Sequence, residues 1–231
     1  MRGLWDRPER LGWFGGGYDS PGIHSVLTRA DQPDTLTLGI SCGGVWISTD
    51  RGATFDLYGD GLVADYLPPD RAGDKNTQDP HRLAACAAAP DRVWMQHHNG
   101  IFRSDDGGRT WTRLHPPVSG FGFGVAAHPT DPDTAWFVPG QKDSNRIPVD
   151  GAVVVNRTRD GGKTWETLRA GLPQQHAYDL TYRHALAVDA TGTRLAFGST
   201  TGNLWLSEDA GDTWRHLSAH LSPIYAVTFG A

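Results

Sequence analysis

Short apolar stretches recur along the chain, and turn-forming residues separate them. In each of four successive units, a stretch of small apolar residues comes first, a second apolar stretch follows, and a third leads into a polar turn. In the first unit these stretches are residues 24–27, 35–38 and 44–47. They are too short for ordinary helices and are rich in β-branched and aromatic residues, which favours strands. The pattern therefore predicts repeated antiparallel hairpins.

The polar turn after the third stretch has one pattern in all four units: Ser or Thr, any residue, Asp, any residue, Gly, any residue, Thr, and an aromatic residue. An Asp side chain can accept hydrogen bonds from backbone N–H groups further along a turn, and Gly tolerates a positive φ. The aromatic ring can anchor the turn in the apolar layer beside it. We therefore predict a structural role, and neither catalysis nor metal binding, for Asp50, Asp106, Asp160, Asp209, Gly52, Gly108, Gly162, Gly211, Phe55, Trp111, Trp165 and Trp214.

With a fourth strand after each turn, every unit becomes a four-stranded antiparallel sheet. Such sheets repeated around an axis are the blades of a β-propeller. We predict an all-β protein with one domain over residues 1–231, with blades at about 22–58, 82–115, 122–169 and 184–217 and a last inner strand at 224–229. Propellers usually close with about four to eight blades. We expect these four complete blades to belong to a larger ring of six to eight, with N-terminal blades missing, or to self-associate through open blade edges.

Two further sequence features bear on the ends of the blades and on the cysteines. Gly3-Leu4 matches Gly61-Leu62 and Gly171-Leu172, which follow a blade, so the first 20 residues resemble the exit from an earlier blade. Cys42 and Cys86 each lie in an apolar strand-like stretch. Two isolated cysteines make neither a disulfide framework nor a zinc site, so we predict buried free thiols.

Charge and hydropathy narrow the classes of partner. The formal net charge is -5, and no run of Lys and Arg is present, which argues against a nucleic-acid partner. The N-terminus lacks the apolar core of a signal peptide, and no segment approaches the roughly 20 apolar residues that span a bilayer. The sequence thus predicts a cytoplasmic protein without membrane contact, a prediction that a missing N-terminal segment would change.

The four turns resemble those of the BNR (bacterial neuraminidase repeat) or Asp-box superfamily, within the WD40/YVTN/BNR-like propellers. Residues 3–10 and 102–108 look most like those of bacterial sialidase-like repeat proteins. The group includes sialidases, xyloglucan-cleaving glycosidases, sortilin-type receptors and photosystem assembly factors, so the resemblance implies a fold more than an activity. A sialidase of this group carries a Phe/Tyr-Arg-Ile-Pro motif before its first box. Here Asn145-Arg146-Ile147-Pro148 lacks the aromatic residue and follows the second box, which we interpret as loop sequence.

Candidate ligand-binding residues lie on the loops opposite the Asp-box turns, where a rigid ring commonly carries function. Two of these loops are long, at about 59–80 and 139–151. We expect a small-molecule, glycan or protein ligand to be bound there by His24, His81, His97, His98, Tyr178, Arg183, His184 and Arg146. A His-rich metal site is an alternative, since imidazole suits zinc and iron. No His-x-His or His-Glu-x-x-His spacing supports it, so we predict no metal and no cofactor.

Three functions are consistent with this sequence. A glycoside hydrolase needs two carboxylates about 5 to 9.5 Å apart, for which the candidates are Asp65, Asp79 and Asp179, with Tyr182 and Arg183 contacting the substrate. A non-catalytic binding or assembly propeller needs no such pair. A fragment of a larger propeller would have no function by itself. We favour the binding or assembly propeller, because no catalytic constellation is complete in this sequence.

Overall fold

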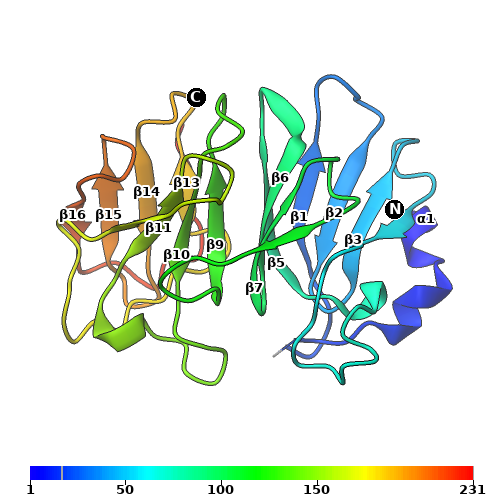
Figure 1. Cartoon of the computed structure of the whole chain (residues 1–231), viewed down its shortest axis with the longest axis horizontal. Helices are drawn as coiled ribbons and strands as arrows, with labels where there is room; N and C mark the ends of the chain where they lie inside the picture. Colours follow the sequence, from blue (N-terminus) through cyan, green and yellow to red (C-terminus); the bar gives the residue numbers. More distant parts are fainter. Residues whose placement is uncertain (17, 231) are drawn as a thin grey trace.

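The computed structural model describes residues 1–16 and 18–230 and confirms the all-β propeller architecture (Figure 1). Four antiparallel sheets each contain four consecutive strands. The first blade comprises β1 (Ile23–Thr28), β2 (Leu36–Ile40), β3 (Gly44–Ser48) and β4 (Asp56–Tyr58), and the second β5 (Pro80–Cys86), β6 (Ala89–His97), β7 (Gly100–Ser104) and β8 (Thr112–Leu114). The third comprises β9 (Gly122–Ala127), β10 (Ala135–Pro139), β11 (Val155–Thr158) and β12 (Glu166–Leu168), and the fourth β13 (Leu186–Val188), β14 (Leu195–Gly198), β15 (Leu204–Ser207) and β16 (Arg215–Ser218).

The first strands of the four blades share one axis. β1 packs beside β5, β5 beside β9, and β9 beside β13, and all four line an axial cavity together with residues 227–230. In Figure 1 the blades follow one another across the molecule, from the blue first blade to the orange fourth. The segment 224–229 lies beside β13, where Ala226 forms an isolated parallel bridge with His184. The structure thus arranges the four blades as neighbouring sectors of a partial propeller.

The remaining regular elements are short. They are α1 (Arg2–Trp5), η1 (Pro8–Gly12), η2 (Lys75–Thr77) and η3 (Val149–Gly151). The turn η3 precedes the strand that leads into the third box, and β11 begins at Val155. Among the described residues, no helix has the length and apolar character needed to cross a membrane.

The apolar core lies between neighbouring blades. Val45 of the first blade packs with Phe102 and Trp111 of the second. Trp94 of the second blade packs with Phe137 of the third, and Trp136 packs with residues of the fourth. Each large apolar side chain buried in this way contributes about 1.5–3 kcal/mol relative to an exposed one. Blade-to-blade packing therefore holds the array together. Cys42 and Cys86 are buried free thiols, as predicted.

The Asp-box turns have the same hydrogen bonds in every blade. In the first, the Ser48 hydroxyl donates to Asp50 Oδ1 (2.8 Å) and accepts from the Gly52 N–H (2.8 Å). The Asp50 carboxylate accepts from the Thr54 N–H (2.9 Å) and hydroxyl (2.7 Å). These two bonds lower the pKa of Asp50 to about 2. The other three boxes repeat the arrangement.

The chain leaving one blade packs against the box of the next. Gly61 has φ +88°, and a Cβ there would lie 2.0 Å from the Trp111 carbonyl oxygen; Gly171 has φ +84° and approaches the Trp214 carbonyl in the same way. Because a side chain would clash with backbone, glycine is required at both positions. The leucine that follows each glycine joins the apolar cluster of that box tryptophan. At the first blade, Gly3 lies against the Ala53 carbonyl and Leu4 packs with Phe55.

Candidate functional site

The side of the propeller opposite the Asp boxes is formed by the loops between the second and third strands of each blade and by the segments that lead into the inner strands. We call it the loop face. Asp79, just before β5, ties two blades together there. Its Oδ1 accepts hydrogen bonds from the Ser41 hydroxyl (2.8 Å) and the Cys42 N–H (3.3 Å), both in the β2–β3 loop.

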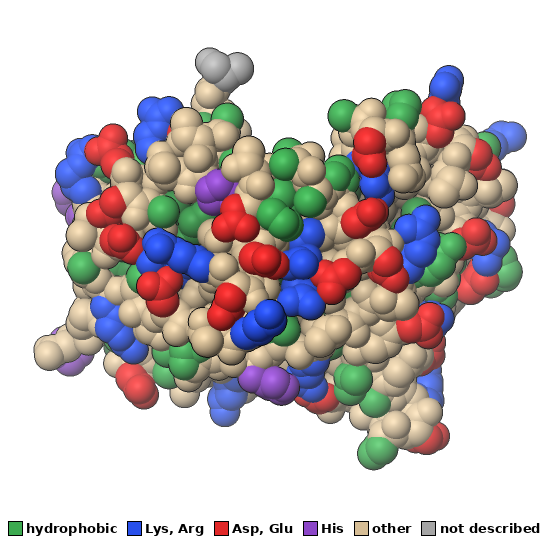
Figure 2. Space-filling view, turned by 45° about the horizontal axis from the view of Figure 1, so that its top comes forward, with side chains coloured by type: hydrophobic (Ala, Val, Ile, Leu, Met, Phe, Trp, Pro, Cys, Tyr) green, Lys and Arg blue, Asp and Glu red, His purple; other side chains and the backbone are tan. Residues whose placement is uncertain are grey.

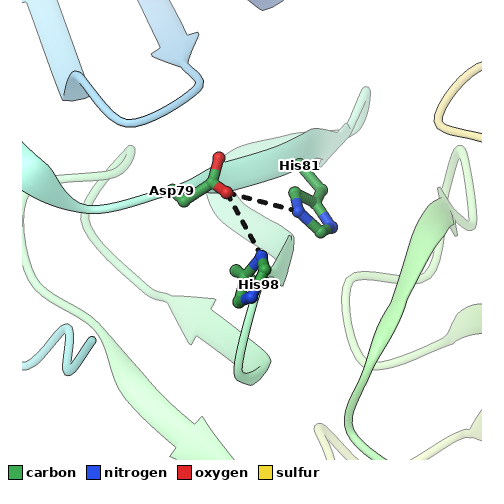
Figure 3. A group of neighbouring side chains, drawn as sticks. All are labelled: Asp79, His81 and His98. Carbon is green, nitrogen blue, oxygen red and sulfur yellow. Dashed lines mark ion pairs between the residues drawn. The ribbon is translucent and has the colours of Figure 1, made fainter. Parts of the chain in front are cut away.

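Two histidines face the other oxygen of the same carboxylate (Figure 3). His81 Nε2 lies 3.4 Å and His98 Nδ1 3.3 Å from Asp79 Oδ2. The β5–β6 hairpin brings these groups together, because Pro80 pairs with His97 in its register and the His98 N–H donates to the Asp79 carbonyl (3.0 Å). We call Asp79, His81 and His98 the Asp79 cluster. One carboxylate oxygen of Asp79 and one ring nitrogen of each histidine all lie within 4.8 Å of one another.

The Asp79 cluster is almost closed to solvent. The side chains of Asp79 and His81 are 2% and 3% exposed, whereas that of His98 is 22% exposed. Burial alone would raise the pKa of the Asp79 carboxyl, but the two imidazoles and the Ser41 hydroxyl outweigh burial and hold this pKa well below its usual range. Burial lowers the pKa of His81 despite the adjacent carboxylate. An anionic Asp79 therefore faces imidazole nitrogens in a dry environment.

An aromatic surface adjoins the Asp79 cluster. The His81 ring stacks on Phe123 with centroids 4.4 Å apart. The guanidinium groups of Arg183 and Arg146 lie 5.0 and 5.4 Å from the centre of the Phe123 ring. Tyr182 contacts the edge of Phe123 and stacks on Tyr225 at 5.6 Å. We call Phe123, Tyr182, Tyr225, Arg146 and Arg183 the aromatic platform.

Sequence reasoning missed two members of this platform. Phe123 lies in β9, where the alternation in Phe121-Gly122-Phe123 places both rings on one side of the strand. That alternation was the available signal. Tyr225 was counted only as part of an inner strand, and the sequence carries no sign that it would stack on Tyr182.

The other predicted ligand-binding residues are spread over the loop face. His97 is fully buried, its pKa is lowered to about 3 by burial, and its Nε2 accepts from the Asp79 N–H (3.1 Å). His24 is half-buried, and burial, followed by the charge of Arg183, lowers its pKa to about 4. Burial also lowers the pKa of His184, which is bridged to Ala226 through its backbone. Tyr178 is 64% exposed.

The three candidate carboxylates bind separate partners. Asp65 forms a two-bond ion pair with Arg113, at 2.7 and 3.2 Å, in an exposed position. Asp79 belongs to the cluster described above. Asp179 Oδ1 accepts from the Ser199 hydroxyl and the Asn203 side-chain amide, both at 2.7 Å, and from the Thr201 hydroxyl. Each carboxylate thus has its own hydrogen-bonding or ion-pairing partners.

Charges on the visible surface are mixed in sign. Figure 2 shows blue Lys and Arg side chains interspersed with red Asp and Glu side chains, without a broad field of either sign. Ion pairs link neighbouring blades, as between Arg29 and Asp91 (2.7 Å) and between Arg92 and Asp133 (2.5 Å). A mixed surface of this kind gives little long-range attraction for a polyanion.

Comparison with known proteins agrees with this architecture. The family model described as BNR/Asp-box repeat matches residues 102–113, which contain the second box. The probable oligoxyloglucan-reducing end-specific xyloglucanase of Neosartorya fischeri is 30% identical over 165 residues, which cover 67% of this chain and 18% of that protein. Xyloglucanase Xgh74A of Acetivibrio thermocellus is 30% identical over 135 residues, which cover 54% of this chain and 16% of that protein. This chain therefore spans less than a fifth of the length of these relatives.

A solved structure shows the same fold. The GH74 xyloglucanase from Xanthomonas campestris superposes with a TM-score of 0.61 at 19% identity, covering 89% of this chain and 31% of that one. The repeated turns, the family match and the four sheets together define the class: a β-propeller built from Asp-box blades. The chain contains a BNR/Asp-box repeat within this propeller fold, and it resembles a portion of the xyloglucanases named above.

Proposed function

We propose that this chain is a glycan-binding propeller that holds its ligand on the loop face and does not hydrolyse it. The observation that carries the proposal is the aromatic platform, in which Tyr182 and Tyr225 stack beside the cationic side chains of Arg146 and Arg183. The relatives named above are xyloglucanases, so xyloglucan oligosaccharides are the first ligands to test.

The chemistry of the platform suits a sugar ring. A pyranose has C–H groups on its faces and hydroxyl groups around its rim. Aromatic rings can pack against the faces, while guanidinium groups supply donors for the rim oxygens. The Tyr225 side chain is 61% exposed, so its ring is accessible.

The carboxylates favour binding over hydrolysis. A glycosidase keeps two carboxylates free to act on opposite sides of one bond. Asp65 is held by Arg113, and Asp179 by three side-chain donors. Asp79 faces two imidazoles and a hydroxyl. This supports a binding role, whereas the hydrolase alternative requires one of these pairings to open when substrate binds.

Calorimetric titration of the full chain with xyloglucan oligosaccharides, cello-oligosaccharides and sialyllactose tests the proposal. We expect xyloglucan oligosaccharides to bind, and Tyr182→Ala and Tyr225→Ala each to weaken binding about tenfold, which corresponds to about 1.4 kcal/mol. Leu217→Ala is the matched control, because Leu217 is 42% exposed on the outer strand β16. It should bind as the unaltered chain does.

Three outcomes would contradict the proposal. Release of reducing ends from xyloglucan, abolished by Asp179→Asn or Asp65→Asn, would establish a hydrolase. Absence of binding to all three glycan classes by a folded chain would leave the assembly-scaffold or inactive-fragment interpretation. Tyrosine variants that bound as tightly as Leu217→Ala would show that the aromatic platform is not the binding surface.

A further inference from the structure

We propose that the Asp79 cluster is a binding site for one divalent transition-metal ion of the zinc type, with Asp79 Oδ2, His81 Nε2 and His98 Nδ1 as its ligands. The proposal is independent of the glycan-binding function, because none of its three ligands belongs to the aromatic platform. It also revises the prediction from sequence, which contained no metal site.

The donor set fits this class of ion. Two imidazole nitrogens and one carboxylate oxygen form a common set for zinc and for non-haem iron(II) sites, which keep further positions open for water or a ligand. Calcium and magnesium prefer sites built from oxygen atoms. Two of the three side chains are nearly excluded from solvent, and a bound cation would offset the desolvation of the buried carboxylate.

The distances match a coordination shell. For an ion bound at about 2.1 Å by each ligand, two ligands at a tetrahedral angle lie about 3.4 Å apart. The two observed distances to Asp79 Oδ2 are 3.4 and 3.3 Å. Charge-assisted N–H···O hydrogen bonds are shorter, at about 2.7–2.9 Å. The spacing thus favours an ion between these atoms over a direct imidazole–carboxylate hydrogen bond.

Neighbouring groups orient the ligand atoms. His81 Nδ1 lies 2.6 Å from the Gly122 carbonyl oxygen, which can only accept, so Nδ1 carries the proton. In the neutral ring, the lone pair of Nε2 then faces Asp79 Oδ2. Ser41 and the Cys42 N–H bind Oδ1 and leave Oδ2 for the ion. Metal-ligating histidines usually have such a carbonyl partner at the second nitrogen, and ligating carboxylates are likewise hydrogen-bonded.

One member of the cluster is partly exposed. His98 is the partly exposed member and marks the direction from which an ion can enter. Gly16 covers Asp79, and a Cβ at Gly16 would lie 3.1 Å from Asp79 Oδ2. A glycine there keeps the space above the carboxylate oxygen free. Three protein ligands would leave a fourth position for water or for an oxygen of a bound molecule.

Metal titration of the full chain tests the proposal. After removal of metal with a chelator and dialysis, Zn²⁺ binding would be followed by calorimetry with elemental analysis, and Co²⁺ binding by its visible d–d absorption. We expect one equivalent of either metal to bind. His98→Gln should weaken Zn²⁺ affinity at least about 100-fold, more than is usual for loss of a group that only orients a ligand.

The control is His220→Gln, because His220 is exposed beyond β16. It should bind like the unaltered chain, and circular dichroism should show that both variants are folded. If His98→Gln does not fold, the Co²⁺ spectrum of the unaltered chain still decides, since bands typical of nitrogen and oxygen coordination are expected. Less than about a tenth of an equivalent of bound metal, or equal binding by His98→Gln and His220→Gln, would overturn the proposal.

Discussion

The two ends of the blades are built on different principles. At the Asp-box end, four turns repeat the same hydrogen bonds between residues at most four positions apart, as in Ser48 with Gly52 and Asp50 with Thr54. At the loop face, every blade differs, and the contacts join residues far apart in sequence. Asp79 reaches Ser41, and His81 stacks on Phe123.

The contrast separates structural from functional use of the same residue types. The carboxylate oxygens of the box aspartates accept hydrogen bonds from groups within their own turns. Asp79 is bound by groups from two blades, and one of its oxygens faces two imidazoles. A repeated aspartate therefore indicates folding, whereas an aspartate found in a single blade, with partners drawn from elsewhere, marks the place to look for a ligand.

The largest expected effect tests the box end. Trp111 is 5% exposed, packs between the first and second blades, and donates from Nε1 to the Gly108 carbonyl (3.1 Å). Trp111→Ala should lower the free energy of unfolding by about 3–5 kcal/mol, because it leaves a cavity between blades. Urea denaturation measures this. Trp5→Ala, at a tryptophan that is 65% exposed, should cost less than about 1 kcal/mol. Equal losses would contradict the anchoring role.

A smaller effect separates two adjacent aspartates. Asp106 accepts from the Arg109 N–H, the Thr110 N–H and hydroxyl, and the Ser104 hydroxyl. Asp106→Ala should cost about 1–2 kcal/mol, as does loss of a comparable capping side chain. Among the described residues, the Asp105 side chain has only surface ion pairs, with Arg92 and Arg103, so Asp105→Ala should cost at most about 1 kcal/mol. A larger loss of stability for Asp105→Ala than for Asp106→Ala would show that the surface ion pairs stabilise the fold more than the turn does.

The smallest effect is a pH dependence. The pKa values of Asp50 and Asp160 are lowered from 3.8 to about 2 by hydrogen bonds from Thr54 and Thr164. The unfolded chain therefore binds more protons in this range, so their stabilisation is complete above pH about 4 and is lost as the pH falls toward 2. Urea denaturation between pH 5 and pH 2 should show a shallower decline for the double variant Asp50→Asn, Asp160→Asn. An unchanged decline would show that other carboxylates dominate.

The sequence was sufficient to predict the blades, because the residues that specify each turn and strand lie close together in the chain. The box pattern specifies its own hydrogen bonds, and the alternation of short apolar stretches specifies the strands that flank it. The Asp79 cluster depends on tertiary structure, although part of it could have been predicted from the sequence. Once residues 80–86 and 89–97 pair as a hairpin, Asp79 and His81 must lie near His98. Gly122 and Phe123 could not be placed beside His81 from sequence, because they come from the next blade.

The contact between a blade's exit and the following box, seen after the first and third blades, has a consequence for how such arrays grow. Gly61-Leu62 and Gly171-Leu172 each form one half of a joint, and the tryptophan of the next turn forms the other. A duplicated gene segment that encodes one unit would encode both the Gly-Leu exit and the box tryptophan. The new unit could therefore form the same contact with the unit before it and the unit after it. Lengthening by tandem copying would then require no new complementary surface to evolve.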